Sequence, residues 1–308
     1  MTKIIIAVVG PTAIGKTRCA ISLAQHFDTE IISADSRQFY KEMKIGTAVP
    51  SNSELATVKH HFIQHISIKK PYSIGDFERD AALVLKELFQ EKDIVILVGG
   101  SGMYLDAVCY GLDDFPQINP IVRKNLNTIL DQNGLLPLQE QLKSLDAEYY
   151  HKVDLKNPHR LIRALEVCLS SGRPYSSFLG ERKKHHDAKC LFIGLHASRQ
   201  VIYNRINKRV DEMLQNGLLE EVKKLMPYRN LNALNTVGYK ELFNYFDEQT
   251  TLPNAIAEIK KNTRRFAKRQ LTWYRKNEAI QWVNHNLSEA SFIGSVINQL
   301  EKIQDTTA

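Results

Sequence analysis

Cysteine is scarce in this sequence, and the few cysteines are scattered. They form no C-x-x-C pair and have no close histidine partners; the four are Cys19, Cys109, Cys168 and Cys190. This pattern argues against a zinc site and favours a reducing compartment. Adjacent histidines also match no metal-binding pattern and are predicted to lie on the surface; they form the pairs His60–His61 and His185–His186.

Long apolar runs are also missing. The longest, IIIAVV and IVILV, are far too short to cross a bilayer, so the sequence predicts no membrane span. Met1 leads straight into the first of these runs, and we therefore expect no signal peptide. Together with the cysteine pattern this predicts a cytoplasmic protein, with a monomer as the default expectation.

The first motif that is present is a glycine-rich loop, GPTAIGKT. Gly10, Gly15, Lys16 and Thr17 match G-x-x-x-x-G-K-T, between a β-branched apolar run and a segment with helical spacing. In such a strand–loop–helix unit the backbone N–H groups and the helix N-terminus face an anion. Lys16 is predicted to reach an outer phosphate, and the Thr17 hydroxyl to coordinate Mg²⁺. The loop alone does not say whose phosphates it holds.

The order of the remaining segments predicts an α/β fold. Strands expected at 4–9, 30–35 and 93–100 alternate with helices after the loop, at 76–90 and from 101, which indicates a parallel sheet. The length of 308 residues predicts two lobes. After Leu112 the pattern becomes helical, with helices expected at 120–133, 136–145 and 158–171, and a strand returns at 188–197. We therefore expect a P-loop NTPase-like core of parallel strands at 1–112 and 188–308, and a helical insertion domain at 113–187.

An acidic residue is missing where a phosphoryl-transfer enzyme often carries one. The strand at 93–100 ends in Gly99 and Gly100, whereas such enzymes often hold Mg²⁺ with an acid that ends a second strand. The acid follows the strand at 30–35 instead, as Asp35, at the sheet edge where ligands bind in open α/β folds. From its position Asp35 could act as a base, bind a metal indirectly, or cap the next helix.

Positive charge is in excess and is concentrated near the C-terminal end. The formal net charge is +7, and the segment KKNTRRFAKRQLTWYRK, residues 260–276, has eight Lys or Arg and no acid. A helix here would carry two basic columns at a spacing of four, Lys260–Arg264–Lys268 and Lys261–Arg265–Arg269. A solvated helix face would look the same, but charge of one sign favours contact with nucleic-acid phosphates. The apolar residues of the segment are expected to face the protein: Phe266, Ala267, Trp273 and Tyr274.

An ordered set of short motifs resembles the bacterial tRNA dimethylallyltransferases, also called isopentenyltransferases. The set runs from residue 4 to about 276 and comprises GPTAIGKT, ISADSRQFYKEMKIGTAVP, YSIGDF, LVGGSGMYLDAV, NPHRLIRALEV, SGRP, RVDEMLQNGLLEEV, VGYKEL and TRRFAKRQLTWYR. The resemblance implies transfer of a dimethylallyl group from dimethylallyl diphosphate to N6 of adenine 37 of tRNAs that read codons starting with U, with release of diphosphate. The loop then holds the leaving diphosphate rather than ATP.

The resemblance also implies roles for residues at matching positions. Asp35 matches the general base, and Ser101 matches a position near the acceptor amine that is usually Thr. The diphosphate, with Mg²⁺ on Thr17, would be held by the loop and by two arginines that close over it: Gly10, Pro11, Thr12, Ala13, Ile14, Gly15, Lys16, Thr17, Arg205 and Arg209. An exposed helix surface is the ordinary alternative for the two arginines.

The positions that match tRNA contacts lie in three regions. The resemblance places them around the acceptor base, on the insertion that would grip the anticodon stem-loop, and in the basic segment: Asp35, Ser36, Arg37, Gln38 and Ser101; Arg123, His159, Arg160, Leu161, Ile162 and Arg163; Lys261, Arg265 and Arg269. Gln38 would read base edges, and Arg37 stands where the family more often has an apolar residue. Arg163 and Glu166 could instead form a plain helix pair.

Three other functions are compatible with part of these features. An isopentenyltransferase acting on AMP or ADP would share the loop and Asp35 but would not need the basic insertion. A P-loop kinase or ATPase would hydrolyse or transfer a phosphoryl group without a prenyl donor. A basic RNA-binding protein without activity would leave Lys16 and Thr17 without a role.

Overall fold

The computed structural model describes residues 2–305, which form two compact units. Unit 2 is Tyr110–Lys184, and unit 1 is formed by the chain on either side of it. The insertion expected from the sequence, 113–187, begins and ends three residues further along the chain. Within the described residues, no helix combines the length and the apolar character that crossing a membrane requires.

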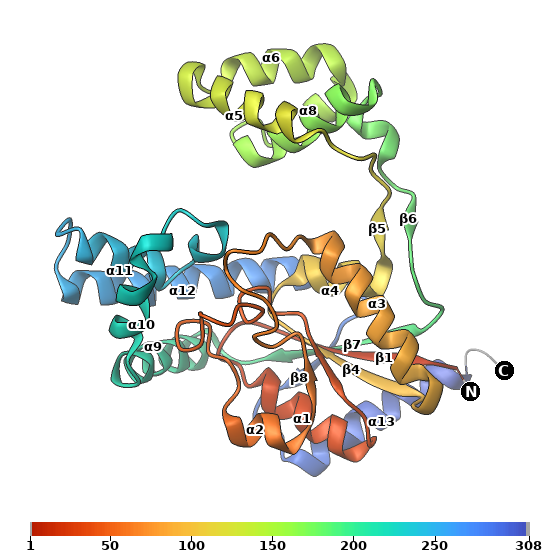
Figure 1. Ribbon diagram of the computed structural model, residues 1–308. Helices are drawn as coiled ribbons and strands as arrows, with labels where there is room; N and C mark the ends of the chain where they lie inside the picture. Colours follow the sequence, from red (N-terminus) through yellow and green to blue (C-terminus); the bar gives the residue numbers. More distant parts are fainter. Residues whose placement is uncertain (1, 306–308) are drawn as a thin grey trace. The chain divides into compact units, whose positions relative to one another are not determined.

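Unit 1 is built on a six-stranded sheet in which every pairing is parallel (Figure 1). The strand order is β3-β2-β4-β1-β7-β8, with β1 Ile4–Val9, β2 Ile31–Ser33, β3 His60–His61, β4 Ile94–Val98, β7 Lys189–His196 and β8 Gln281–Asn284. All six residues of β1 are buried, as expected for a central parallel strand. Because the strands are parallel, their carboxyl ends share one edge, where ligands bind in such folds.

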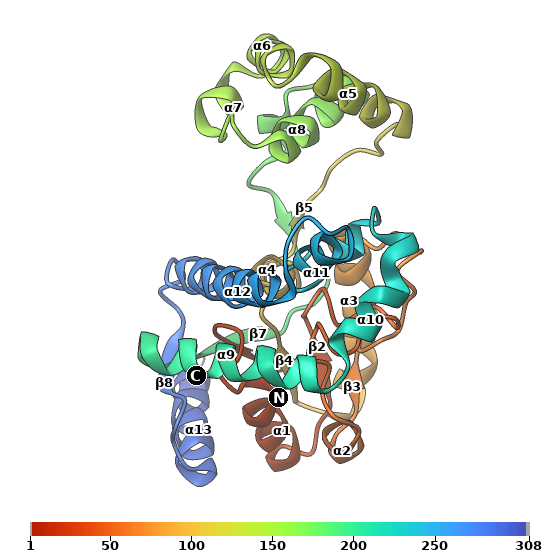
Figure 2. The same cartoon turned by 90° about the vertical axis from the view of Figure 1, so that its left-hand side faces the viewer.

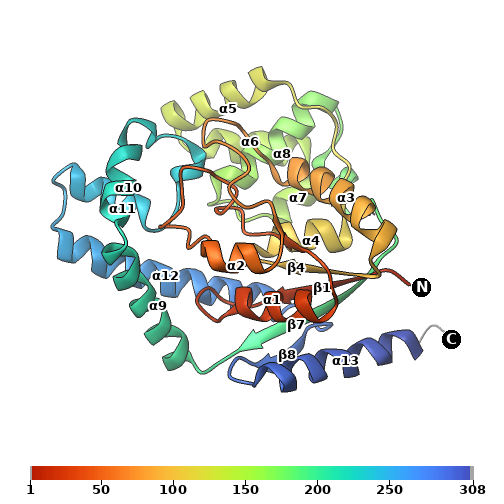
Figure 3. The same cartoon turned by 60° about the horizontal axis from the view of Figure 1, so that its bottom comes forward.

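Helices cover both faces of this sheet (Figure 1, Figure 3). One face carries α1 Lys16–His26 and α13 Glu289–Asp305, and the other carries α3 Ile74–Glu91, α4 Gly102–Tyr110 and α12 Leu252–Tyr274. The short α2, Asn52–Thr57, begins at a capping box formed by Ser51 and Glu54. The core between sheet and helices consists of aliphatic side chains such as Ile6, Leu23, Ile193 and Val296.

The C-terminal part of unit 1 adds a group of helices around α12 (Figure 2). These are α9 Arg199–Gln215, α10 Leu218–Leu225 and α11 Tyr239–Phe246, with the single turns η2 Met226–Tyr228 and η3 Asn232–Leu234. The side chains of Ser198 and Thr251 cap α9 and α12 by accepting backbone N–H bonds. Both α9 and α11 pack against α12, and Gln270 of α12 contacts Thr12 of the phosphate loop.

Unit 2 is a helical unit with its own core. It contains α5 Pro120–Asn133, α6 Leu136–Leu145, α7 Ala147–Lys152, α8 Pro158–Ser171 and the turn η1 Tyr175–Phe178. Its chain enters through β5 Leu112–Asp113 and leaves through β6 Arg182–Lys183, which pair antiparallel. Asn119 and Asn157 cap α5 and α8, and the core is formed largely by leucines: Leu126, Leu138, Leu142, Leu161 and Leu165.

The structure confirms the predicted α/β core and most predicted elements. The helices at 120–133, 136–145 and 158–171 occur with the expected bounds. The strand at 188–197 is β7, and the helix at 76–90 begins at Ile74 because Ser73 caps it. β3, β8 and α7 were not predicted as separate elements.

The prediction that both histidine pairs lie on the surface is wrong for three of the four residues. His60 and His61 are half-buried and form β3 at the edge of the sheet, where His61 Nε2 lies 2.6 Å from Glu30 Oε2. His186 is half-buried with Nε2 2.8 Å from the Val108 carbonyl, whereas His185 is exposed. The pairing of β3 with β2 and the contacts with Glu30 and Val108 hold these residues in half-buried positions.

Candidate active site

The phosphate loop connects β1 to α1 in a conformation that requires glycine. Gly10 and Gly15 have φ angles of 143° and 106°. A β-carbon on Gly10 would lie 2.9 Å from the Leu195 carbonyl oxygen, so the loop passes too close to β7 for any side chain. Ala13 also has a positive φ, 63°. The loop is therefore held in an open turn at the carboxyl edge of the sheet.

Several donors of the loop are available for an anion. Among the described residues, the backbone amides of 13–17 donate no hydrogen bond, and they lie at the N-terminus of α1. Lys16 Nζ donates to the Pro11 carbonyl at 3.0 Å. Burial lowers the pKa of Lys16 to about 8, although the negative charge of Asp35 opposes this shift. Free amides and a buried cation are what a diphosphate needs.

Two arginines from α9 lie at the loop, at the positions for which the resemblance implies diphosphate binding. Arg209 Nη1 donates to Thr12 Oγ1 at 3.2 Å. Arg205 Nη2 lies 3.5 Å from where a β-carbon on Gly15 would be, and Arg205 Nη1 lies 3.3 Å from His285 Nδ1. The structure thus brings the arginines, Lys16 and the loop together at one edge of the sheet.

Asp35 lies two residues after the end of β2 and does not cap α2, which starts only at Asn52 and is capped by Ser51. Its Oδ1 accepts the backbone N–H of Arg37 at 3.3 Å. Burial raises the pKa of Asp35, and the nearby Lys16 and Arg209 charges oppose the shift. A carboxylate whose proton affinity is raised, next to a cationic anion site, suits a general base.

Ser101 lies beside Asp35 because two strand ends converge. A β-carbon on Gly99 would lie 2.5 Å from the Ala34 carbonyl oxygen, so only glycine lets the ends of β2 and β4 approach this closely. The hydroxyls of Ser101 and Ser36 are 3.1 Å apart, and the Ser36 N–H donates to Ser101 Oγ at 3.3 Å. These bonds orient the Ser101 hydroxyl at the N-terminus of α4.

Two residues that sequence reasoning did not single out hold the site together. Gln270 Oε1 accepts the Thr12 N–H at 2.8 Å, and Gln270 Nε2 donates to the Gly100 carbonyl at 2.8 Å. Tyr274, four residues further along α12, donates its hydroxyl to the Gly99 carbonyl at 3.4 Å. Tyr274 was expected to face the protein and Gln270 was not considered, and the sequence did not show that this face of α12 meets the phosphate loop.

Some of these groups line one cavity of about 760 Å³, to which the phosphate loop contributes Thr12. Its polar lining includes Thr12, Asp35, Ser101, Arg209 and Gln270, and its apolar lining includes Tyr104, Val210, Met213, Leu218, Ile259 and Phe266. The segment at 44–46 is fixed beside it because Glu221 accepts the N–H groups of Lys44, Ile45 and Gly46. An anion site, a carboxylate and an apolar wall in one cavity suit a substrate with a phosphate head and a hydrocarbon tail.

Comparison with known proteins agrees with this geometry. A family model described as IPP transferase matches residues 38–277. The tRNA dimethylallyltransferase of Christiangramia forsetii is 60% identical over 282 residues, which is 92% of this chain and 93% of that protein. The chain belongs to the IPP transferase family. The tRNA dimethylallyltransferase of Flavobacterium johnsoniae is 53% identical over 305 residues, 97% of this chain and 99% of that protein.

Solved structures of IPP transferases have the same fold. The full-length tRNA isopentenylpyrophosphate transferase of Bacillus halodurans superposes with a TM-score of 0.71 at 34% identity, covering 98% of this chain and 96% of that one. A eukaryotic dimethylallyltransferase acting on tRNA superposes with a TM-score of 0.79 at 26% identity, covering 92% of this chain and 74% of that one. The P-loop NTPase-like fold expected from the sequence is therefore confirmed.

In this IPP transferase, Arg37 and Gln38 both bind backbone of unit 1. The Arg37 guanidinium donates to the carbonyls of Asn232, Ala233 and Asn235. Gln38 Nε2 donates to the carbonyls of Thr47 and Ala48 at 3.2 and 3.0 Å. Both side chains thus hold loops at the cavity. To contact a base edge, either side chain would have to give up its hydrogen bonds to these backbone carbonyls.

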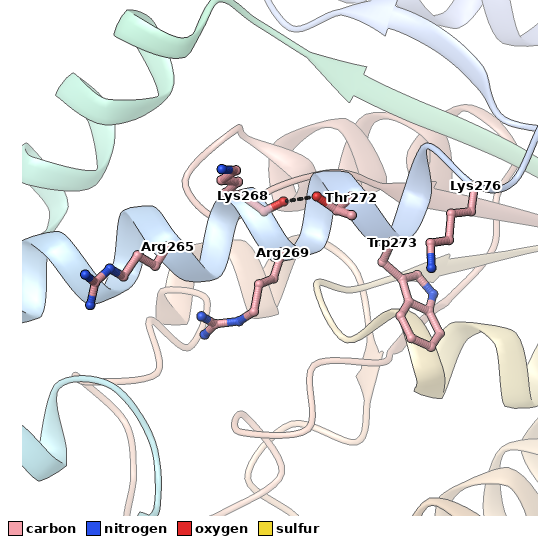
Figure 4. A pocket seen from close by; sticks show the side chains of 6 residues that line it. All are labelled: Arg265, Lys268, Arg269, Thr272, Trp273 and Lys276. Carbon is pink, nitrogen blue, oxygen red and sulfur yellow. Dashed lines mark hydrogen bonds between the residues drawn. The ribbon is translucent and has the colours of Figure 1, made fainter. Parts of the chain in front are cut away.

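The two basic columns of α12 face different surroundings. In the first, Lys260 pairs with Asp211 at 2.6 Å and Arg264 donates to Asn207 Oδ1 at 2.8 Å, so these side chains are turned toward α9. In the second, Arg265 and Arg269 are exposed (Figure 4). Lys261 of the same column pairs with Glu258 one turn earlier.

The apolar residues of α12 are not all inward. Ala267 and Tyr274 are buried, as predicted, but Phe266 and Trp273 are 39% and 41% exposed, which corrects the expectation that they face the protein. The 3.6-residue period explains the difference, since 266 and 273 lie two turns apart on the flank of the buried stripe. Both side chains line the cavity described above.

The predicted contacts in unit 2 divide into exposed and buried residues. Arg123 and Arg163 both bind the buried carboxylate of Glu166, at 2.5 and 2.7 Å. His159 and Arg160 are exposed in the first turn of α8. The side chains of two further predicted residues, Leu161 and Ile162, are 0% and 5% exposed and belong to the core of unit 2, so they offer no surface to an RNA.

A metal site made by the protein alone is not formed. Within residues 2–305 no group of three or more His, Cys, Asp or Glu is placed to hold an ion. Mg²⁺ is commonly bound through one or two protein oxygens together with substrate phosphates. The Thr17 hydroxyl, in the first turn of α1 next to the free loop amides, is an oxygen of this kind. The residues present therefore fit an ion carried by a bound diphosphate.

Proposed function

We propose that this IPP transferase transfers a dimethylallyl group from dimethylallyl diphosphate to N6 of adenine 37 of tRNA and releases diphosphate. The observation that carries the proposal is one cavity that combines Asp35, Thr12 of the phosphate loop, Arg209 and an apolar wall. Relatives named tRNA dimethylallyltransferase and a structure of a dimethylallyltransferase acting on tRNA support it.

In the transition state of this reaction, two opposite charges develop that the site must stabilise. As the C–O bond of the donor breaks, the diphosphate gains negative charge and the allylic carbon gains positive charge. The amides of 13–17, Lys16, Arg205 and Arg209 would bind the departing diphosphate. Mg²⁺, held by Thr17 and the diphosphate, would neutralise part of this charge. The apolar wall would exclude water from the carbocation-like carbon.

The acceptor needs a base, because the lone pair of an adenine exocyclic amine is delocalised into the ring. Asp35 is placed to accept the N6 proton as the new C–N bond forms, and Ser101, oriented by Ser36, would hydrogen-bond the same amine. A base inside a stacked loop cannot reach this cavity, so the adenine must leave its stack.

We propose that, outside the adenine cavity, the tRNA is held by two surfaces. The exposed Arg265 and Arg269 of α12, preceded by Lys261, would contact phosphates, and unit 2 would bind the anticodon stem through His159 and Arg160. Arg123 and Arg163 keep the α5–α8 pair in place through Glu166 and could add charge to that surface. The enzyme is proposed to act as a cytoplasmic monomer.

One incubation with Mg²⁺ and labelled dimethylallyl diphosphate tests the function. An anticodon stem-loop with A36-A37-A38, AMP and ATP are offered separately. We expect label on the stem-loop and none when A37 is replaced by G. Label on AMP alone would make the enzyme a small-molecule isopentenyltransferase. ATP consumption without any labelled product would assign the loop to a nucleotide.

A further inference from the structure

The outward column of α12 ends in an aromatic residue. Lys261, Arg265 and Arg269 are followed, again four residues later, by Trp273, so three cations and an indole share one column of the helix. Figure 4 shows Arg265, Arg269 and Trp273 of this column. Trp273 is 41% exposed, although an indole on a helix flank usually finds an apolar neighbour. The proposed function gives this ring no role.

Trp273 lines a second, shallower cavity of about 410 Å³. The other lining residues are Arg265, Lys268, Arg269, Thr272 and Lys276, so the lining holds four cations and no carboxylate. Among the residues that the structure describes, none of these four cations forms an ion pair. A flat aromatic surface inside a cationic rim is the arrangement with which proteins bind unpaired nucleotides.

The second cavity adjoins the catalytic one. Arg269 and Trp273 line both, and the catalytic cavity also contains Asp35 and Ser101. A nucleotide on Trp273 would therefore be next to a nucleotide whose base is in the catalytic cavity. The two cavities are therefore placed to bind two consecutive nucleotides of one RNA strand.

The indole is fixed rather than free to swing. Its Nε1 donates to Asp106 Oδ2 at 3.0 Å, and its ring packs so closely on Gly102 that a β-carbon there would lie 2.4 Å from Trp273 Cδ1. Gly102 and Asp106 belong to α4, whose N-terminus carries Ser101. A platform held on the same helix as the acceptor-binding serine keeps a constant position relative to the reacting amine.

We propose that Trp273 stacks against a nucleobase that neighbours the reacting adenine and so replaces the stacking partner that this base loses when the adenine leaves the loop. The proposal rests on the proposed function and names the part of the RNA that the second cavity binds. The four cations would hold the phosphates on either side of the stacked base. A protein partner is disfavoured because the lining carries four cations and shares Arg269 and Trp273 with the adenine cavity.

Binding of A36-A37-A38 stem-loops tests the proposal, with wild type, Trp273→Leu, Trp273→Phe and Tyr228→Leu. Tyr228 is a matched control: it is 37% exposed, carries Lys69 over its ring and lines neither cavity. We expect Trp273→Leu to raise the stem-loop Kd about tenfold, as loss of one base–aromatic stack does. Trp273→Phe, which keeps a ring but loses the bond to Asp106, should recover most of this loss, and Tyr228→Leu should bind as wild type does.

Stem-loops with an abasic site at position 36 or at position 38 identify the stacked base. If the abasic site removes the base that stacks on the indole, wild type and Trp273→Leu should bind that RNA with equal Kd. For the RNA that is abasic at the other position, the tenfold difference in Kd should persist. A tenfold difference with both abasic RNAs, or a Phe variant as weak as the Leu variant, would overturn the proposal and assign Trp273 to the support of α4.

A measurement on the wild-type protein alone tests the stacking even if the variants do not fold. With 2-aminopurine at 36 or 38, binding should leave the probe quenched at the stacked position and brighter at the other. Equal brightening at both positions contradicts stacking. If wild type does not prenylate the unmodified stem-loop at all, the proposed function fails instead, so the two failures are separate.

Discussion

At the scale of single residues, the site combines two groups whose charged forms are both disfavoured by burial. Burial raises the pKa of Asp35 and lowers that of Lys16 to about 8, and each charge partly offsets the shift of the other. The carboxylate thereby gains proton affinity, which a base acting on N6 requires. The ammonium stays available to a dianionic or trianionic ligand, whose charge would raise its pKa again.

Replacement of Asp35 by Asn should lower the single-turnover rate of prenyl transfer by about 10²-fold or more, because an amide accepts no proton. The Kd for the stem-loop should stay close to that of wild type, since only one charge near the acceptor changes. Asp93→Asn, at the amino end of β4 and paired with Lys3, is the control and should react normally. Normal turnover by Asp35→Asn would remove Asp35 as the base.

The pKa of Lys16 predicts an alkaline limit of kcat/KM for dimethylallyl diphosphate near pH 8. Above this pH the free enzyme loses the ammonium that binds the diphosphate. Lys16→Arg should be slower but should keep its activity to higher pH, because a guanidinium stays protonated. Lys16 should affect stability in the opposite direction to activity. Between about pH 8 and 10.5 the unfolded chain binds more protons at this residue than the folded one, so the free energy of unfolding should rise with pH. A pH profile of the Arg variant that coincides with wild type would assign the limit to another group.

At the scale of elements, α12 performs three tasks with three faces. Its buried face places Gln270 against the phosphate loop and Tyr274 against the end of β4. Its first basic column binds α9 through Lys260 and Arg264, and its second column is directed outward. A single helix thus joins the diphosphate site, the acceptor site and the proposed RNA surface.

The sequence predicted the periodicity of this helix but not its neighbours. Repeats of four identify which residues share a column, yet the partner of a column depends on how α9 and α12 pack, which no local pattern encodes. The phosphate loop was predictable because its glycines and flanking strand and helix are contiguous in the chain. Gln270 was not, because its contacts with Thr12 and Gly100 span 258 and 170 residues of sequence.

Replacing Lys261, Arg265 and Arg269 by Gln should weaken stem-loop binding and flatten its dependence on salt. Each phosphate contact to single-stranded RNA contributes about 0.7 to the slope of log K against log salt, so the slope should fall by about 2. The matched control is Lys260→Gln with Arg264→Gln, which removes two charges of the inward column. The slopes of log K against log salt are measured by fluorescence anisotropy from low to moderate salt. An unchanged slope in the triple variant would show that this face of α12 does not contact RNA phosphates.

At the scale of the whole molecule, the two units have separate cores and separate proposed tasks. The core of unit 1 lies around the sheet, and that of unit 2 lies between α5, α6 and α8. The chain passes between them as a pair of antiparallel strands, with Asp113 opposite Arg182. Such a junction lets one unit be removed without cutting a strand of the sheet that carries the site.

A variant in which Asn-Gly replaces residues 114–181 should therefore fold. It should keep the affinity for diphosphate and lose affinity for the tRNA stem-loop. The dipeptide closes the β5–β6 ribbon as a two-residue hairpin turn. Inorganic diphosphate should bind as to the full chain by calorimetry, because the loop, Lys16 and Arg209 all belong to unit 1. The stem-loop Kd should rise by on the order of tenfold or more, as expected when several phosphate contacts are lost. In the full chain, His159→Ala with Arg160→Ala should reproduce part of that rise. Loss of diphosphate binding would show that unit 1 depends on unit 2 for its fold, and an unchanged stem-loop Kd would show that the RNA is held by unit 1 alone.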